Sequence, residues 1–337
     1  MEILEISDTQ RFRLVRKLAT GGMGAVYEAL QDGAEGFEKV VALKTILEEY
    51  STDPTFVQMF IGEAKLVADL IHQNIVQIYQ LGKHDKTYYI AMEFIEGVNL
   101  EDFLRKHKEM GRRMPVDIAA FIASRVCRGL EYAHAKCDKQ GRILNVVHRD
   151  ISPKNIMISI EGVAKITDFG IAKAANVMMS QEGDVLMGKL QYMSPEQAQF
   201  KETDRRSDIF SLGIVFYEML AGTELFDGEK STHILRAVIQ QPIPSIRQIR
   251  EDVPVELESI LLKALERDLD LRYQDAGQMG YDLEYFMYHD RFGPNNPTLA
   301  KYLFELYPDL APKAPMPVQP DPERCASKAK TIVIKKK

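Results

Sequence analysis

The sequence is organised around the stretch His148-Arg149-Asp150-Ile151-Ser152-Pro153-Lys154-Asn155, which brings a carboxylate, a cation and a side-chain amide together within a few residues. The flanking runs Leu144–Val147 and Ile156–Ile158 are typical of short buried strands, so we expect a tight loop held from both sides. A second carboxylate, Asp168, follows 18 residues after Asp150. A base, metal ligands and a cation that converge on one point suit phosphoryl transfer, because that chemistry depends mostly on positioning and charge neutralisation.

Length and composition exclude several classes of protein. The 337 residues can bury a substantial core and could form two or three domains. A formal charge of −6 gives no overall positive field, which argues against a nucleic-acid-binding protein. The 3 cysteines are unpatterned, which suits a reducing cytoplasm better than a disulfide framework or a zinc site. No apolar run predicts a membrane span or a signal peptide, so we expect a soluble, cytoplasmic protein.

A glycine-rich turn is predicted near the start of the chain. Residues 12–18 alternate apolar and basic residues, as a half-exposed strand does, and run into Ala19-Thr20-Gly21-Gly22-Met23-Gly24-Ala25-Val26-Tyr27. Glycines between two strands let backbone N–H groups close over phosphates. Alone, the pattern is more often an ordinary hairpin turn, so the nucleotide interpretation depends on the other motifs.

A lysine and a glutamate are candidates for one ion pair. Val41-Ala42-Leu43-Lys44 has the pattern of a buried strand that ends in the lysine. The residues from Pro54 to about Ile71 have apolar positions at helical spacing. Glu63 lies in the middle of this predicted helix, where it could reach Lys44; the alternative is an exposed helix carboxylate.

The rest of the chain predicts two more strands and then a mostly helical region. The strands are expected at Val76–Gly82 and Tyr88–Phe94, and the helices at Leu100–Lys108, Val116–Ala135, Tyr281–His289 and Leu299–Leu306. A polar insertion, Lys136–Asn145, precedes the His148–Asn155 stretch. Residues 312–337 carry seven Lys or Arg against two Asp or Glu, a net charge of +5. A disordered, solvated tail is the simpler interpretation, and docking of the tail to an acidic partner is the alternative.

The order and spacing of these motifs resemble those of the eukaryotic-like (Hanks-type) bacterial serine/threonine protein kinase family. The resemblance covers about residues 12–290 and includes Asp168-Phe169-Gly170 and Tyr192–Glu196. It implies an α+β, bilobal protein kinase fold. An N-lobe of about 12–95 would hold a small antiparallel β-sheet and one helix, and a C-lobe of about 96–290 would be larger and mainly helical. Residues 1–11 would then be a lead-in, 291–310 a helical extension and 311–337 the disordered tail.

The resemblance implies a role for each matching residue. Asp150 would accept or orient the proton of the substrate hydroxyl, and Asn155 and Asp168 would bind Mg²⁺, for which Mn²⁺ could substitute. Lys44, paired with Glu63, would hold the α- and β-phosphates of ATP. Residues of the glycine-rich turn, the base-sandwiching positions, the gatekeeper Met92 and the hinge would contact ATP: Ala19, Thr20, Gly21, Gly22, Met23, Gly24, Val26, Ala42, Lys44, Met92, Glu93, Ile95 and Met157.

Several positions depart from the family pattern. Ala19 stands where the first glycine is usual. Ser152 replaces the lysine that serine/threonine kinases usually carry two residues after the catalytic aspartate, and we expect Lys154 to reach the γ-phosphate instead. Lys189 replaces a common threonine, so tyrosine or dual specificity stays open. Ser180 is the one hydroxyl in residues 171–187, which leaves open both a phosphorylation switch and phosphate-independent activity.

Two supporting features are implied as well. Asp208 matches the buried aspartate that anchors the catalytic loop, and Glu196 and Arg272 match a buried ion pair. We therefore predict an active kinase that transfers the γ-phosphoryl group of ATP to serine or threonine of protein substrates, with autophosphorylation and a role in signal transduction. The alternatives are a pseudokinase-like binding scaffold and a dual-specificity kinase.

Overall fold

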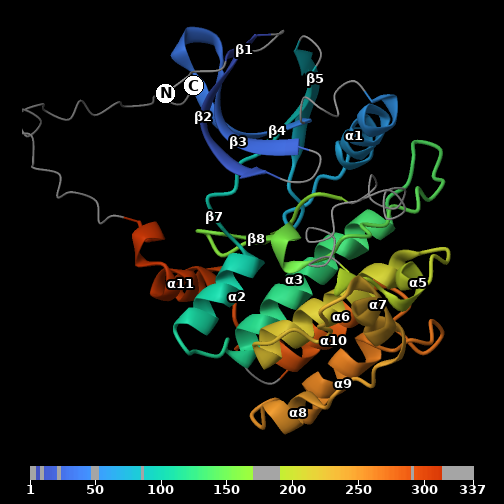
Figure 1. Cartoon of the computed structure of the whole chain (residues 1–337). Helices are drawn as coiled ribbons and strands as arrows, with labels where there is room; N and C mark the ends of the chain where they lie inside the picture. Colours follow the sequence, from blue (N-terminus) through green and yellow to red (C-terminus); the bar gives the residue numbers. More distant parts are fainter. Residues whose placement is uncertain are drawn as a thin grey trace, which may run out of the picture.

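The computed structural model describes residues 5–7, 11–20, 24–46, 53–84, 87–169, 190–289 and 292–312. Within these ranges the side chains at positions 5–7, 55, 59 and 63 are not described. A smaller lobe built on a β-sheet lies above a larger helical lobe (Figure 1). The predictions for Gly21, Gly22, Met23, Gly170, Ser180, Lys189 and the tail from residue 313 fall outside the described residues.

The smaller lobe is an antiparallel sheet with one helix beside it. The strand order is β1-β2-β3-β4-β6-β5. The elements are β1 (Glu5–Ser7), β2 (Arg11–Thr20), β3 (Gly24–Asp32), β4 (Glu38–Ile46), α1 (Pro54–Val67), β5 (Ile78–His84) and β6 (Thr87–Glu93). Phe60 and Ala64 of α1 pack on Ile46 and Ile90 of the sheet. This small core holds α1 against β4 and β6, the strands that lead to the interlobe cleft.

The larger lobe is mostly helical and contains a three-stranded sheet, ordered β7-β8-β9, at its upper edge. Its strands are β7 (Gly97–Asn99), β8 (Ile156–Ser159) and β9 (Ala164–Ile166). Its helices are α2 (Leu100–Glu109), α3 (Val116–His134), α5 (Pro195–Ala198), α6 (Arg205–Ala221), α7 (Ser231–Gln240), α8 (Ile246–Ile249), α9 (Val255–Ala264), α10 (Ala276–Tyr288) and α11 (Asn296–Leu306).

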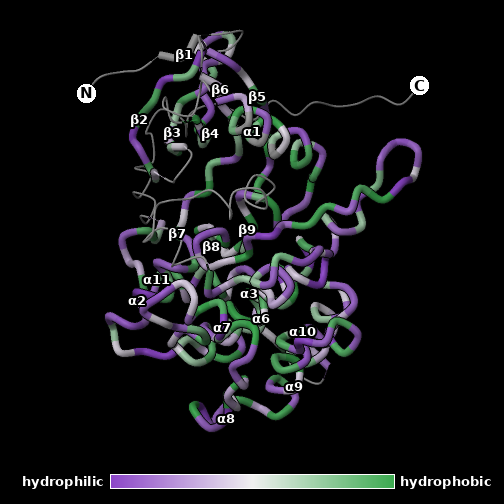
Figure 2. Tube along the Cα trace, turned by 45° about the vertical axis from the view of Figure 1, so that its right-hand side comes forward, coloured by the Kyte–Doolittle hydropathy of each residue, from purple (hydrophilic) through white to green (hydrophobic). Residues whose placement is uncertain are grey.

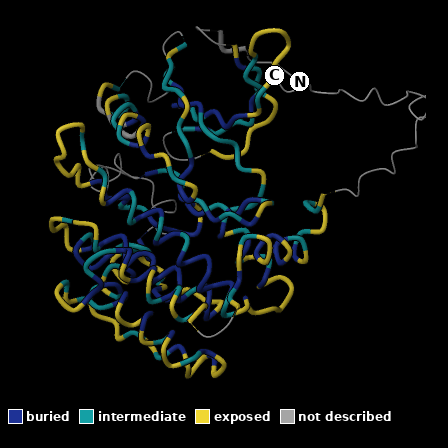
Figure 3. The backbone as a smooth tube through the Cα atoms, turned by 180° about the vertical axis from the view of Figure 1, so that it is seen from behind, coloured by how far each residue is buried: buried dark blue, intermediate teal, exposed yellow. Residues whose placement is uncertain are grey.

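Helices α3 and α6 form the centre of the larger lobe. Hydrophobic residues concentrate along these two helices (Figure 2). The backbone at the centre of the lobe is buried, while the surrounding loops are exposed (Figure 3). Asp204 caps the start of α6, where its side chain accepts the Arg206 N–H, and Gly222 caps its end with a φ of 76° that suits a glycine. Because α6 is buried on nearly every side, it gives the loops above it a rigid base.

Helix α11 packs on the outer side of α2. Tyr302 donates a hydrogen bond to His107 Nε2 at 2.7 Å, and the Tyr307 hydroxyl donates to the Asp102 carbonyl at 2.8 Å. The β8–β9 turn approaches α11 so closely that a Cβ at Gly162 would lie 1.9 Å from the Asn296 carbonyl oxygen. Glycine is therefore required at that turn, where φ is also 74°.

The predicted bilobal α+β fold is confirmed, with two corrections to its elements. The expected strand at Leu144–Val147 is wrong, since these residues form no strand. The backbone that follows is held by a side chain instead: the N–H groups of His148 and Arg149 donate to the Asp208 carboxylate. Helix α10 starts at Ala276 and not at Tyr281. Its early glycine Gly280 allows close packing on α3, since a Cβ there would lie 3.0 Å from the Cys127 Cβ. The insertion Lys136–Asn145 forms a small hairpin that contains the bridge Cys137↔Ile143.

Candidate active site

A buried carboxylate holds the backbone of the loop at 148–155. Asp208 accepts the N–H of His148 at 2.8 Å and the N–H of Arg149 at 2.7 Å. His134 Nε2 lies 2.8 Å from the same carboxylate. Burial alone would raise the pKa of Asp208, but the hydrogen bond and charge of His134 and the backbone donors outweigh it, so this pKa is lowered. The loop is thus fixed from below by α6.

The side chain of Asp150 is oriented by Asn155. The Asn155 Nδ2 atom donates to the Asp150 carbonyl at 2.8 Å and to Asp150 Oδ2 at 2.6 Å. The Thr167 N–H donates to the Asn155 carbonyl at 2.9 Å, which ties the loop to the segment before Asp168. Since nitrogen is engaged with Asp150, the amide oxygen is the atom of Asn155 that could bind a metal ion.

An ion pair crosses the cleft between the lobes. Lys44 Nζ, from β4, lies 2.8 Å from Asp168 Oδ1, and the two side chains are 18% and 32% exposed. Asp168 has a φ of 54°, an uncommon conformation for a residue other than glycine. Glu63 lies in α1, and its side chain is not described, so the Lys44–Glu63 pair stays a prediction.

The residues expected around the adenine ring lie on strands that meet at the cleft. Val26 of β3 pairs with Lys44 of β4, and Ala42 of β4 pairs with Met92 of β6. Met157 lies on β8, in the larger lobe. Ala19 and Thr20 end β2 and Gly24 begins β3, on either side of the glycine turn, while Glu93 and Ile95 lie where β6 passes into β7.

Comparison with known protein families covers the region that holds these residues. The model of the protein kinase domain matches residues 12–279. The chain belongs to the protein kinase family. It is 41% identical over 290 residues to the tyrosine-protein kinase MasK of Myxococcus xanthus, covering 86% of this chain and 45% of that protein. It is 35% identical over 289 residues to the serine/threonine-protein kinase PrkC of Bacillus subtilis, covering 86% and 42%. The chain therefore spans less than half the length of these two curated relatives.

A solved kinase domain has the same fold. The PknI kinase domain of Mycobacterium tuberculosis superimposes with a TM-score of 0.59 at 24% identity, over 81% of this chain and 94% of that one. At this identity the likeness supports the fold alone. Among the described helices, none is long and apolar enough to cross a membrane.

The Lys154 side chain is mostly exposed and contacts helix α2. Lys154 Nζ is 3.5 Å from Glu101 Oε1 of α2, and the two side chains are 61% and 51% exposed. Exposed pairs of this kind contribute about 0–1 kcal/mol. The contact therefore does not hold the ammonium in place, and the γ-phosphate role stays a prediction.

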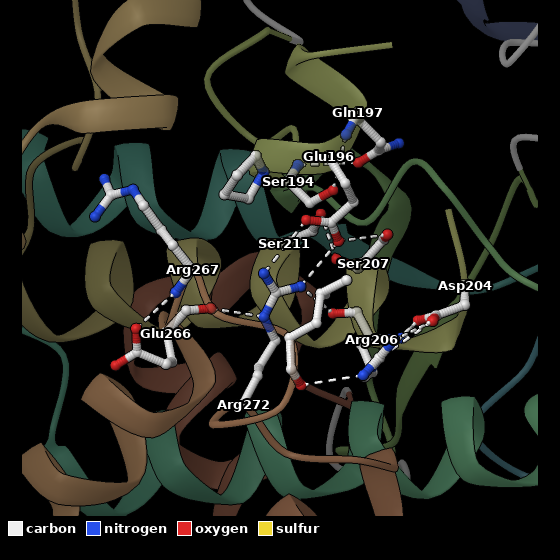
Figure 4. A network of polar contacts seen from close by, with 12 residues as sticks. Ser194, Glu196, Gln197, Asp204, Arg206, Ser207, Ser211, Glu266, Arg267 and Arg272 are labelled. Atoms are coloured by element: carbon white, nitrogen blue, oxygen red, sulfur yellow. Dashed lines mark hydrogen bonds and ion pairs between the residues drawn. The ribbon is translucent and has the colours of Figure 1, made fainter. Parts of the chain in front are cut away.

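The segment that closes the activation region is held by a buried pair. Arg272 Nη1 lies 2.9 Å from Glu196 Oε1, as the family resemblance implies, and Ser207 donates to the same oxygen at 2.7 Å. Figure 4 shows the Arg272 guanidinium between Glu196 and the carbonyl groups below it. Burial alone would raise the pKa of Glu196, but the hydrogen bond and charge of Arg272, together with the Ser207 hydrogen bond, outweigh it, so this pKa is lowered.

A second carboxylate supports the same segment. The Tyr192 hydroxyl donates to Glu218 Oε2 of α6 at 2.6 Å. Burial, together with the charges of Glu224 and Glu101, raises the pKa of Glu218 to about 7. The sequence did not point to this contact, because Glu218 reads as an interruption of an apolar helix.

Other contacts of the loop were also missed. Gln197 Nε2 donates to the Arg149 carbonyl at 3.0 Å, and Arg149 Nε donates to Thr203 Oγ1 at 3.2 Å. One signal was readable: Ser194 and Gln197 form a capping box, a pattern that marks a helix start. His134 had no such signal.

Proposed function

We propose that this protein kinase transfers the γ-phosphoryl group of ATP to serine and threonine hydroxyls of protein substrates. Two contacts support the proposal: Asn155 orients the Asp150 carboxylate, and Lys44 of the smaller lobe pairs with Asp168. A binding scaffold would not require these side chains together. Kinase activity is therefore favoured over a pseudokinase-like scaffold.

A divalent metal ion fits the donors at this cleft. Within the described residues no three His, Cys, Asp or Glu side chains gather as a metal site. The Asp168 carboxylate and the Asn155 amide offer hard oxygen donors, and they are few. Such a site is typical of Mg²⁺, which keeps several bound waters and also binds phosphate oxygens of the substrate. When bound, Mg²⁺ or Mn²⁺ would neutralise charge that develops on the phosphates.

The protein residues would bind ATP and orient the attacking hydroxyl. Asp150 accepts or orients the proton of the attacking hydroxyl, and Asn155 Nδ2 keeps its carboxylate in place. Lys44 binds the α- and β-phosphates once its contact with Asp168 opens, and Glu63 holds it from α1. Val26, Ala42 and Met157 enclose the adenine ring, while the Glu93 carbonyl and the Ile95 N–H bind its edge.

A second candidate is transfer to tyrosine, alone or with serine and threonine. Ser152 occupies the place of the usual serine/threonine-kinase lysine, and the relative MasK is named a tyrosine-protein kinase. The sequence identity to the serine/threonine-protein kinase PrkC supports the first candidate. We also propose a cytoplasmic signalling role with autophosphorylation, while docking of the basic tail to an acidic partner is the weaker proposal.

One experiment separates these candidates. Wild type and Asp150→Asn are incubated with Mg-ATP and a general protein substrate, and phosphorylated residues are identified by mass spectrometry. We expect phosphoserine and phosphothreonine, with the rate at least about 100-fold lower in the variant, because a positioned base contributes that much or more. Phosphotyrosine would favour the second candidate. Absence of Asp150-dependent transfer with Mg²⁺ or Mn²⁺ would support the scaffold.

A further inference from the structure

A charged pair lies at the start of the hinge, between residues that the catalytic motifs do not include. Lys165 Nζ, from β9, is 3.0 Å from Glu93 Oε2, and the side chains are 13% and 25% exposed. This pair is more shielded from water than the exposed pair at Lys154. A charge-assisted hydrogen bond in such surroundings is shorter and stronger than a neutral one, and salt screens it less.

Further contacts hold the side chain and the N–H of Glu93. Its carboxylate also accepts the Gln77 N–H at 3.2 Å, and its own N–H donates to the Gln77 carbonyl at 2.8 Å. The carbonyl of Glu93 is the polar group that these contacts do not use. Side chain and N–H together fix the orientation of the residue, and so the direction of the peptide that carries this carbonyl.

The same contacts connect the hinge to the metal side of the cleft. Val76 N–H donates to the Ile166 carbonyl at 2.9 Å, and Ile166 N–H donates to the Asn74 carbonyl at 2.8 Å. Ile166 follows Lys165 directly and precedes Asp168 by two residues. The hinge, residues 74–77 and β9 thus form one hydrogen-bonded unit, and Lys165 is its charged link to Glu93.

We propose that Lys165 is a positioning residue that orients the Glu93 carbonyl toward adenine through its ion pair with the Glu93 carboxylate. The proposal rests on the proposed function, because it takes ATP as the nucleotide. Lys165 acts through Glu93 and not on the reacting atoms. Without the ammonium, the half-buried carboxylate lacks its charged partner, so it leaves the Gln77 N–H and turns toward solvent, and the restraint of the side chain on the hinge peptide is lost.

The test compares variants that separate charge from packing. Lys165→Met keeps the aliphatic stem, Lys165→Arg keeps the cation, and Glu93→Gln removes the charge with the backbone unchanged. For Lys165→Met and for Glu93→Gln we expect the KM for ATP to rise about fivefold, with kcat and the KM for the protein substrate within about twofold. Lys165→Arg should stay within about twofold of wild type. Lys139→Met, an exposed lysine in the Lys136–Asn145 hairpin, is the matched control.

A double variant and direct binding complete the test. Lys165→Met/Glu93→Gln should raise the KM for ATP no further than the worse single variant, because each change removes the same contact. Calorimetric Kd values for Mg-ATP should change in parallel. An unchanged KM and Kd in Lys165→Met, a lowered Tm without a change in KM, or a raised kcat would overturn the proposal. A wild type that binds Mg-ATP without transferring phosphate would contradict the proposed function, while its Kd ratios still test Lys165. A wild type that binds no ATP would overturn both.

Discussion

Lys154 stands at the position where the catalytic loop departs most clearly from its family. Its ammonium lies near Glu101 on α2, in a pair that is too exposed to restrain it. We therefore predict that the Lys154 side chain exchanges this contact for the γ-phosphate when ATP is bound. The loop would then supply its cation from the position four residues after Asp150.

Replacing Lys154 tests this role directly. We expect Lys154→Ala to lower kcat at least about tenfold, or about 1.4 kcal/mol of barrier, because charge on the transferred phosphate loses a counter-ion. Glu101→Gln is the control and should leave kcat within about twofold. Both are measured by steady-state kinetics with saturating ATP. If Lys154→Ala keeps kcat within about threefold, the γ-phosphate role is wrong.

Glu218 makes stability depend on pH. Its pKa is raised to about 7 from 4.5, so the folded protein binds a proton that the unfolded chain releases between these values. The contribution of the protonated carboxyl is complete below pH 4.5 and is lost as the pH rises through about 7. At pH 8 the charged, half-buried Glu218 carboxylate therefore lowers the free energy of unfolding.

The Glu218→Gln variant should remove this cost. We expect its free energy of unfolding to exceed that of wild type by about 1–3 kcal/mol at pH 8 and by less at pH 5.5, since glutamine stays neutral and can still accept from Tyr192. Urea unfolding at the two pH values measures the difference. A variant that is equally or less stable at pH 8 would show that Glu218 ionises without cost in the fold.

At the level of elements, α11 is joined to α2 by a buried polar contact. The Phe103 carbonyl lies 2.7 Å from His107 Nδ1 and can only accept, so Nδ1 carries the proton and Nε2 accepts from the Tyr302 hydroxyl. Burial lowers the pKa of His107, which keeps the ring neutral. Leu299 and Leu303 of α11 are fully buried in the same core.

Removing one hydroxyl tests how firmly α11 is attached. Tyr302→Phe should lower the free energy of unfolding by about 1–3 kcal/mol, because His107 Nε2 is left buried without a donor. Tyr285→Phe, on the exposed face of α10, should change it by less than about 0.5 kcal/mol. Equal effects of the two changes, measured by urea unfolding, would show that the buried hydrogen bond does not contribute.

At the scale of the whole molecule, motif order predicted the bilobal fold, while the catalytic roles that it assigns stay predictions. Those motifs are local, so residues close in sequence define them. Remote contacts of residues that belong to none of these motifs could not be predicted: His134 meets Asp208 at a separation of 74 residues, and Lys165 meets Glu93 at 72. The start of α10 was missed for a related reason. Gly280 lies inside the helix, where it allows close packing on α3, and does not mark a helix end.

Binding of Mg-ATP should stabilise the two lobes together. A ligand at 100 times its Kd adds about 2.7 kcal/mol to the free energy of unfolding, and we expect Tm to rise by several degrees. EDTA should cancel most of this shift, and Asp168→Asn should reduce it, because Asp168 would hold the proposed metal ion. Thermal unfolding measures the shift. A shift that is insensitive to EDTA would contradict the proposed metal site.

The anchoring of the 148–155 loop by Asp208 has a consequence for its motion. The donated N–H protons of His148 and Arg149 point to a carboxylate that is fully buried. Such protons exchange with solvent deuterium mainly when the surrounding core opens. These two N–H groups should therefore show the slow exchange of α6, although residues 148–152 belong to no helix or strand. Motions that accompany turnover then belong to other segments of the chain.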